Sequence, residues 1–334
     1  MSAQIQPKYA FAYDKIGTLA DVYLPNPSER LAVPTVLYWH GGGLSCGDRR
    51  SYLPIWFITK LLDNGYIFIS ADYRLLPPST GHVILQDVLG FTHWAASPNG
   101  LNAQLKQHGD TVSVDTTRLI AAGTSAGGYL AYLAGIYARV QNPLRGVLSL
   151  PRVTDSMLDA PLFAAQEQAI LPWSTPTRSC PIRAFTQHHS PTACRLGIPL
   201  EYGPDGIPSS PRMFMTRVLL QEGIFLDYLT GEHGLSGRLV GLETPSMFNV
   251  PEQHHLLFPE ACVSSSFPPT CLVHGTEDSA VLIGESRAMR DRLQAVGVHC
   301  ELFEVVGAEH SFDYAPGHEE VLDKVFQVVK GWLM

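Results

Sequence analysis

The chain has 334 residues, and its 23 Lys and Arg against 31 Asp and Glu give a formal net charge of −8. Apolar residues make up 45% and charged residues 16%, a balance that excludes a disordered chain and predicts a substantial core. The acidic balance also argues against a general nucleic-acid binder and against docking on anionic lipid, because both need a basic face.

The sequence shows neither a membrane span nor a targeting segment. No run approaches the roughly 18 consecutive apolar residues that a spanning helix needs, and the first 15 residues lack a basic segment followed by an apolar one. The cysteines are scattered without the C-x-x-C spacing of zinc sites or the density of a disulfide framework. We therefore expect a cytoplasmic protein whose thiols are mostly reduced. The cysteines are Cys46, Cys180, Cys194, Cys262, Cys271 and Cys300.

The first 150 residues alternate short apolar runs with longer amphipathic ones. Continuous apolar strands separated by helices predict a parallel sheet that is covered on both faces. In chain order, we expect a strand at 33–39, a helix at 51–64, a strand at 66–71, a helix at 82–96, a strand at 119–122, a helix at 126–140 and a strand at 146–150.

The alternation then stops for about 120 residues that are rich in Pro, Gly and Ser, in which only 213–229 is predicted to be firmly helical. It resumes with a strand at 270–274, a helix at 280–296, a strand at 300–306 and a helix at 317–333. This order predicts one core domain, 1–150 and 268–334, with an insertion at 151–267 that caps a pocket. Aromatic residues of the insertion could form pocket walls or the cap's own core; they are Trp173, Phe214, Phe225, Tyr228 and Phe248.

The strongest local signal is Gly123-Thr124-Ser125-Ala126-Gly127 between a predicted strand and a predicted helix. This context is what the G-x-S-x-G nucleophile elbow requires, because the turn is too tight for bulk two residues either side of the serine. Ser125 is therefore the candidate nucleophile, supported by Gly123 and Gly127.

A second signal, His40-Gly41-Gly42-Gly43, directly follows the strand that ends at residue 39. Acyl transfer needs preorganised N–H donors for an oxyanion, and glycines let a backbone turn several donors toward one point. We expect His40 to brace this loop rather than to act as the base.

A serine nucleophile needs a base and an orienting carboxylate, and both follow predicted strands near the C-terminus. His310 is the candidate base and Asp278 the candidate acid, with Glu277 and Asp313 as alternatives. The carboxyl ends of parallel strands are where ligands bind in open α/β sheets. The paired histidines 188–189 and 254–255 lack the further ligands of a metal site, so we expect neither a metal nor a cofactor.

These motifs together resemble the α/β-hydrolase superfamily, and specifically the hormone-sensitive-lipase-like (H-G-G-G) carboxylesterases. The matching segments are the H-G-G-G loop with Gly47 four residues on, the D-Y-R-L-L-P stretch from Asp72, a following helix with Asp87 and Trp94, and the order of serine, acid and histidine. The resemblance covers roughly residues 10–150 and 268–334. It implies an α/β-hydrolase fold, a mostly parallel, doubly wound sheet with a large cap insertion.

The resemblance also implies roles for individual residues. Gly42, Gly43 and Ala126 would supply the N–H groups of the oxyanion hole. Thr124 stands where the family often has Asp, and a second proline follows Pro77 where an acidic residue is common. We expect Asp72 and Arg74 to form a structural pair behind the oxyanion loop, and Cys46 to be a small apolar filler.

The sequence thus predicts a serine hydrolase that cleaves a carboxylic ester of a small or medium-sized substrate. Alternatives that keep the triad are a thioesterase that releases a polyketide-like acyl chain, a lactonase and a formamidase. A catalytically silent ligand-binding relative is another, although His310 counts against it, and a resemblance to oligopeptidases is weaker because the chain has no room for their propeller domain. The expected partner is a small acyl substrate, and the sequence does not predict an oligomeric state.

Overall fold

The computed structural model describes residues 5–26, 32–138, 141–152, 158 and 211–334. Most of the predicted insertion lies outside these ranges. Trp173, His188, His189, Cys180 and Cys194 therefore lie outside the described residues.

The described chain forms one eight-stranded sheet with the order β1-β2-β4-β3-β5-β6-β7-β8. Strands β3 to β8 pair in parallel, whereas β2 pairs antiparallel with both β1 and β4. The strands are β1 (Tyr9–Ala12), β2 (Leu19–Tyr23), β3 (Ala32–Trp39), β4 (Ile67–Ala71), β5 (Ser113–Ser125), β6 (Gly146–Arg152), β7 (Thr270–Gly275) and β8 (Cys300–Val305).

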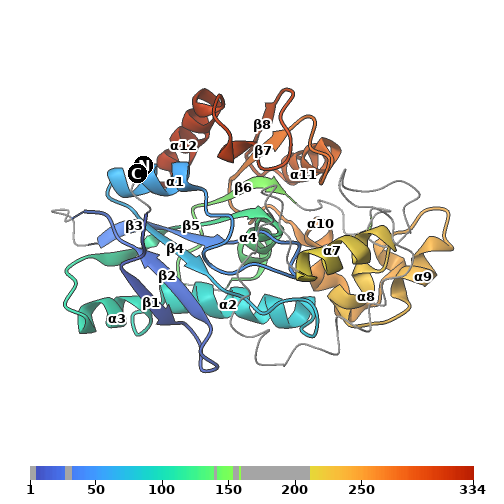
Figure 1. The fold of residues 1–334 in the computed structure, drawn as a ribbon, viewed down its shortest axis with the longest axis horizontal. Coiled ribbons are helices and arrows are strands. Elements are labelled where there is room, and N and C mark those ends of the chain that lie inside the picture. The colour runs from blue at the N-terminus through green and yellow to red at the C-terminus, as the bar shows by residue number, and fades with distance from the viewer. Residues whose placement is uncertain (1–4, 27–31, 139–140, 153–157, 159–210) are drawn as a thin grey trace.

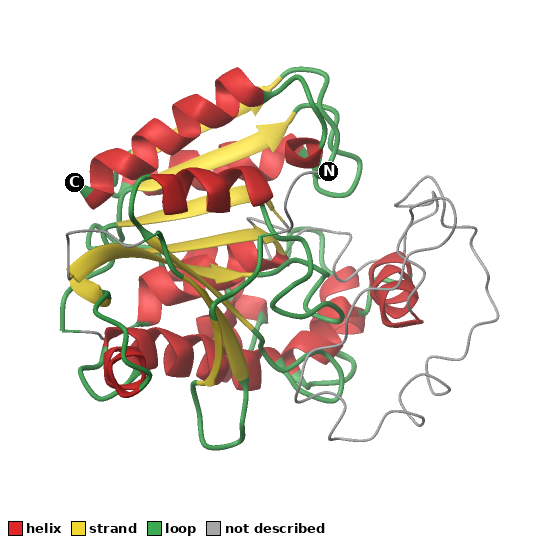
Figure 2. Ribbon diagram, turned by 60° about the vertical axis from the view of Figure 1, so that its left-hand side comes forward, coloured by secondary structure: helices red, strands yellow, loops and turns green. Residues whose placement is uncertain are grey.

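Helices cover both faces of the sheet (Figures 1 and 2). Strand β3 is mostly apolar because both of its faces are buried. Val36 and Tyr38 belong to one buried cluster, and Leu37 and Trp39 belong to the other. The second cluster also includes α2 (Gly81–Ala96), α3 (Leu101–Gln107), α4 (Ala126–Tyr137) and α11 (Ile283–Ala295), and the first includes α1 (Ile55–Asp63) and α12 (Glu319–Leu333).

The predicted α/β architecture is confirmed, and each strand and helix expected in the two core segments is present. The N-terminal hairpin of β1 and β2 and the short helix α3 were not predicted. Strand β5 begins six residues earlier than expected, because residues 113 and 114 already pair with β3 across a register shift.

The prediction of one continuous helix over 213–229 is wrong. The segment divides into α7 (Pro211–Gln221) and α8 (Phe225–Thr230), and Gly223 between them has φ of 61°. The N–H of Ile224 donates to the carbonyl of Leu219 at 2.9 Å, a bond that closes a helix C-terminus after a left-handed residue. The glycine therefore ends the first helix.

Between α8 and β7 the chain forms short helices that pack on the core with α7 and α8. Met215, Leu219, Phe225 and Leu226 belong to the same buried cluster as α2 and α4. In Figure 1, α7 and α8 lie together at one end of the molecule. The short helices are α9 (Leu235–Val240), η2 (Met247–Asn249), η3 (Glu252–Leu257) and α10 (Pro259–Cys262).

The candidate pocket aromatics have different environments. Phe225 is buried in the core, Phe248 is fully exposed, and Phe214 is half-buried. Tyr228 lines a shallow hollow of about 300 Å³ together with Pro77, Pro78 and His233. The division into a core and a 151–267 insertion stays a prediction.

None of the helices in the described ranges is long and apolar enough to cross a membrane. Within the same ranges, no three His, Cys, Asp or Glu side chains gather in a way that could hold a metal ion. Cys46, Cys262, Cys271 and Cys300 are free thiols.

Candidate active site

Ser125 is the last residue of β5, and α4 begins at the next residue. Its φ of 54° and ψ of −124° lie where few residues other than glycine are found. Two glycines make room for this turn. A Cβ on Gly123 would lie 2.1 Å from the backbone of Gly127, and a Cβ on Gly127 would lie 1.9 Å from the carbonyl oxygen of Trp39. The sequence therefore folds into the sharp elbow that the G-x-S-x-G spacing indicates.

The glycine loop after β3 lies directly beside this serine. A Cβ on Gly41 would be 3.2 Å from Cβ of Ser125. Gly42 and Gly43 have φ of 106° and 60°, which turn the loop in a way that L side chains rarely allow. Ala126 is the first residue of α4, where N–H groups have no partner within the helix. The three predicted donors thus lie on two segments that meet at Ser125.

His40 is packed inside this loop. Its Nδ1 lies 2.7 Å from the carbonyl oxygen of Gly41 and so donates to it, and its ring stacks on Tyr73 at 4.3 Å between centroids. The Tyr73 hydroxyl donates to the His40 carbonyl at 3.0 Å. Burial lowers the pKa of His40 to about 4, so the ring stays neutral near pH 7. These contacts match the predicted bracing role.

Cys46 lies in the same loop, with its Sγ 3.3 Å from the carbonyl oxygen of Gly42. Burial raises the pKa of the thiol to about 12. The side chain therefore stays protonated, as expected for a filler rather than a reactive thiolate.

His310 and Asp278 meet although 32 residues separate them. Nδ1 of His310 lies 2.8 Å from Oδ2 of Asp278. Asp278 follows β7 and His310 follows β8. Both residues therefore lie at the carboxyl edge of the sheet, where β5 ends in Ser125. Of the alternative acids, Glu277 is exposed, and buried Asp313 accepts a bond from Trp56 Nε1 at 3.3 Å instead.

Hydrogen bonds keep Asp278 ionised. Burial alone would raise its pKa, but bonds from His274 and His310 and the N–H of Val281 outweigh that effect and hold the pKa below its ordinary value. Donation to the charged form is the cause. The side chain of Asp278 is fully buried, whereas that of His310 is 22% exposed, so the imidazole forms the accessible end of the pair.

The loop that carries His310 turns back toward the elbow. Asp313, three residues on, accepts a bond from Trp56 of α1. Burial raises the pKa of Tyr38, and the charge of Asp313 adds to the rise. The Tyr38 hydroxyl bonds to Thr124 Oγ1 at 2.8 Å, next to the serine. Among the described residues no hydrogen bond joins Ser125 to His310, and in unliganded enzymes this bond is commonly long.

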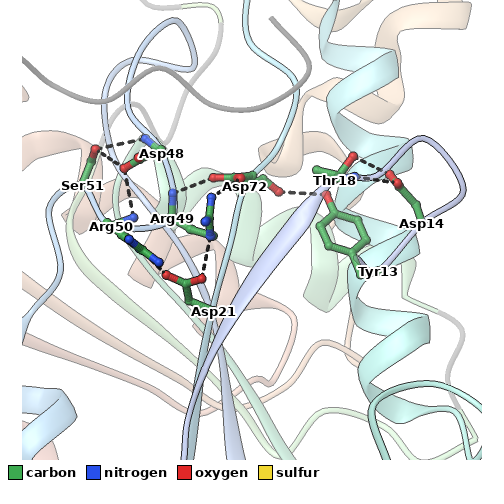
Figure 3. A network of polar contacts seen from close by, with 9 residues as sticks. All are labelled: Tyr13, Asp14, Thr18, Asp21, Asp48, Arg49, Arg50, Ser51 and Asp72. Atoms are coloured by element: carbon green, nitrogen blue, oxygen red, sulfur yellow. Dashed lines mark hydrogen bonds and ion pairs between the residues drawn. The ribbon is translucent and has the colours of Figure 1, made fainter. Parts of the chain in front are cut away.

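The loop after β3 also takes part in an ionic network whose carboxylates are buried (Figure 3). Arg49 donates to Asp21 at 2.7 Å and to Asp72 at 2.8 Å, and Arg50 donates to Asp21 at 2.6 Å. Both carboxylates are fully buried. The network joins the loop after β3 to strand β2 and to the end of β4.

This network corrects one expectation. Asp72 does not pair with Arg74; its partner is Arg49, and Arg74 instead forms a 2.6 Å ion pair with Asp87 of α2. Arg49 lies in the loop after β3 and Asp87 in α2, so Asp72 and Arg74 each bond to a different neighbouring segment. The sequence alone did not indicate Arg49 as a partner.

Helix α7 contributes contacts that the sequence did not predict. The guanidinium of Arg212, 3% exposed, donates to the carbonyl oxygens of Ser45 at 2.5 Å, Leu76 at 2.6 Å and Pro77 at 2.8 Å. Thr216, one turn on, packs against the loop so closely that a Cβ on Gly43 would lie 2.3 Å from its Cγ2. No motif marks either residue, because their role depends on where the helix packs.

The family model BD-FAE matches residues 20–201, which is more than half of the chain and includes the glycine loop and the serine elbow. The chain belongs to the BD-FAE family. Its fold is that of an α/β-hydrolase, as predicted. The narrower likeness to hormone-sensitive-lipase-like esterases stays a prediction.

Two kinds of curated protein are similar to this BD-FAE chain. The non-reducing polyketide synthase prhL of Penicillium brasilianum is 27% identical over 346 residues, a match that covers 96% of the chain but only 13% of the synthase. The probable carboxylesterase M8 of a Phoma species is 24% identical, and the match covers 91% of the chain and 88% of that protein. The chain thus spans a small part of the synthases and most of the esterase.

Solved structures confirm the fold. A Staphylococcus aureus protein of unknown function aligns with a TM-score of 0.61 at 18% identity and covers 98% of the chain and 99% of its own length. An esterase from Thermogutta terrifontis, solved with butyrate, aligns with a TM-score of 0.54 at 16% identity and covers 97% of the chain and 92% of its own length.

Proposed function

We propose that this BD-FAE protein hydrolyses a carboxylic ester through a triad of Ser125, His310 and Asp278. The observation that carries the proposal is the 2.8 Å contact between His310 and Asp278 at the sheet edge where the strained serine stands. A buried carboxylate on Nδ1 leaves Nε2 of the imidazole as the nitrogen that can accept a proton from a serine.

The reaction has two steps. Ser125 Oγ attacks the ester carbonyl carbon as its proton passes to His310. The resulting oxyanion accepts hydrogen bonds from the N–H groups of Gly42, Gly43 and Ala126. The bond to the leaving alcohol then breaks, and the alcohol takes the proton from His310. Water attacks the acyl-enzyme with the same imidazole as base, which releases the acid and restores the serine hydroxyl.

Turnover of a short p-nitrophenyl ester by Ser125→Ala tests this proposal. We expect kcat to fall by about three or more orders of magnitude, as in other triad enzymes that lose one member, with an unchanged circular dichroism spectrum. Ser265→Ala, which alters an exposed serine outside the site, serves as the matched control and should keep full activity. Turnover of a folded Ser125→Ala protein at the wild-type rate would exclude the triad.

A second substrate class is favoured by a specific observation. Seven non-reducing polyketide synthases are similar to the chain, with 24–27% identity across about nine-tenths of it. An acyl chain of the polyketide type, held as a thioester or an ester, would suit the same triad, because the tetrahedral intermediate is alike.

Matched acyl donors separate the two possibilities. The same acyl group is offered as an oxygen ester and as a thioester of N-acetylcysteamine, and kcat/KM is measured for each. A preference of tenfold or more for the thioester, corresponding to about 1.4 kcal/mol of transition-state binding, assigns the enzyme to thioester release. The opposite preference assigns it to ester hydrolysis.

A further inference from the structure

Asp278 contacts other groups besides the proposed base, His310. Oδ1 accepts the N–H groups of Ala280 at 2.9 Å and Val281 at 2.8 Å. Oδ2 faces two imidazoles, with Nδ1 of His310 at 2.8 Å and Nε2 of His274 at 3.2 Å. A carboxylate offers about four acceptor positions, so these four donors fill them and fix the orientation of the carboxyl group.

The surroundings of His274 decide which of its nitrogens carries hydrogen. Nε2 lies 2.9 Å from the carbonyl oxygen of Val281, and a carbonyl oxygen can only accept. Nε2 therefore bears a proton, and the same nitrogen lies 3.2 Å from Oδ2 of Asp278. Nδ1 lies 2.7 Å from Oγ of Ser286 on α11, and the hydroxyl can donate to it. His274 is fully buried and Ser286 is 2% exposed, so the ring is held at both ends.

The other charged groups near this pair are already engaged elsewhere. Glu304 of β8 lies opposite His274 in the strand register and pairs with Arg287 of α11 at 2.6 Å. Glu309 accepts the N–H groups of His310 and Ser279, and Asp313 accepts the bond from Trp56 described above. Of these carboxylates, Asp278 alone contacts both imidazoles.

We propose that His274 is a positioning residue for the reaction: its Nε2–H holds the Asp278 carboxylate in place and draws negative charge away from the oxygen that faces His310. This inference rests on the proposed triad. The protein then carries a second imidazole at the acid, in contact with the same oxygen that faces the base. The effect moderates the charge that the acid presents to His310, so that the imidazolium forms during attack and still releases its proton to the leaving alcohol.

Two substitutions at residue 274 test the role. His274→Leu removes the donor from a site of similar volume, and His274→Gln keeps an N–H donor near the position of Nε2. In His274→Leu the charge on Oδ2 acts on His310 alone and stabilises its protonated form. We therefore expect the acidic limb of kcat/KM to move up by about 0.5 pH unit or more, with kcat reduced at least about tenfold and KM nearly unchanged.

Rescue distinguishes positioning from packing. His274→Gln should return the acidic limb to within about 0.2 pH unit of wild type, a difference below about 0.3 kcal/mol. Val273→Ala is the matched control, because it weakens the packing of β7 on the other face of the sheet without touching Asp278, and its limb should not move. An acidic limb at the wild-type pH in folded His274→Leu would overturn the inference.

Wild-type protein supplies a second readout that does not depend on a variant that folds. In protein labelled with ¹⁵N-histidine, the resonance of His274 should show a proton on Nε2 at pH 7. An Nε2 without a proton would overturn the inference, since it could not donate to Asp278. Labelling of wild-type Ser125 by a fluorophosphonate separates the two proposals. No labelling contradicts the triad. Labelling together with an unchanged acidic limb of kcat/KM in His274→Leu contradicts only the role of His274.

Discussion

Ser125 owes its position to its neighbours rather than to its own preference. With φ at 54° and ψ at −124°, it adopts a strained conformation that persists only where the surrounding structure enforces it. Gly123 and Gly127 enforce it by close backbone approach, since a Cβ on either would lie about 2 Å from backbone atoms. The residue pattern G-x-S-x-G therefore encodes a geometric requirement, which is why the elbow could be predicted from the sequence.

An alanine pair tests this requirement. Gly127→Ala places Cβ 1.9 Å from the carbonyl oxygen of Trp39, so we expect a loss of about 3 kcal/mol or more in the free energy of unfolding, at the upper end of overpacking costs. Gly90→Ala in α2 meets no atom within 4 Å and should instead stabilise by about 0.5–1 kcal/mol through helix propensity. Urea unfolding measures both. Equal stability of the two variants would contradict the close contact.

The pH dependence belongs to the residue scale as well. The pKa of Asp278 is held below its ordinary value, so its carboxylate stays charged, and the stability it contributes persists, as the pH falls toward 4. A histidine base acts only in its neutral form, so protonation of the base stops the reaction. We expect kcat/KM to fall in acid with a slope of one proton while circular dichroism stays constant. A flat rate profile down to pH 4 would exclude His310 as the base.

The acid shows where residue-level prediction from the sequence ends. The sequence named Asp278 as the acid but left Glu277 and Asp313 as alternatives. Burial and direction separate them, because Asp278 points inward to His310, Glu277 points to solvent, and Asp313 turns to Trp56. Both properties depend on the backbone path of the loops after β7 and β8.

At the scale of elements, the contact between α7 and the glycine loop is the main addition to the predicted site. Arg212 binds three backbone carbonyls of the loop and of the segment after β4, and Thr216 covers Gly43. A buried guanidinium that satisfies several carbonyls is costly to remove, because each acceptor then loses a charged donor. The helix from the predicted insertion thus forms part of the wall that holds the loop in shape.

A double-mutant cycle tests this contact. Gly43→Ala should lower the melting temperature, since its new Cβ meets Thr216 Cγ2 at 2.3 Å in a backbone with φ of 60°. Thr216→Ala removes Cγ2 and leaves the nearest side-chain atom at an ordinary 3.4 Å. The double variant should therefore recover about 1 kcal/mol or more relative to the sum of the two single changes. Strictly additive effects would mean that α7 does not pack on the loop.

Elements with a strong period were predicted well, and those defined by packing were not. The buried parallel strands are visible as continuous apolar runs, whereas the antiparallel strands β1 and β2 are short and mixed in composition. The break between α7 and α8 was missed because one glycine inside an amphipathic pattern is often tolerated in a helix. Its φ of 61° shows that it ends the helix here.

At the scale of the whole molecule, one sheet brings distant segments of the chain to a single edge. Ser125 ends β5, Asp278 follows β7 and His310 follows β8, and the glycine loop follows β3. This convergence is a property of parallel strands, so the fold class and the set of candidate residues could be predicted together. The acyl group of the substrate could not be predicted, because the similar proteins include both a probable carboxylesterase and polyketide synthases.

The acyl-enzyme is the central claim, and mass spectrometry of the covalently labelled protein tests it most directly. After incubation with a fluorophosphonate, we expect one adduct per chain, located on Ser125, and none in Ser125→Ala. An unlabelled wild-type protein, or an adduct on another residue, would contradict the account.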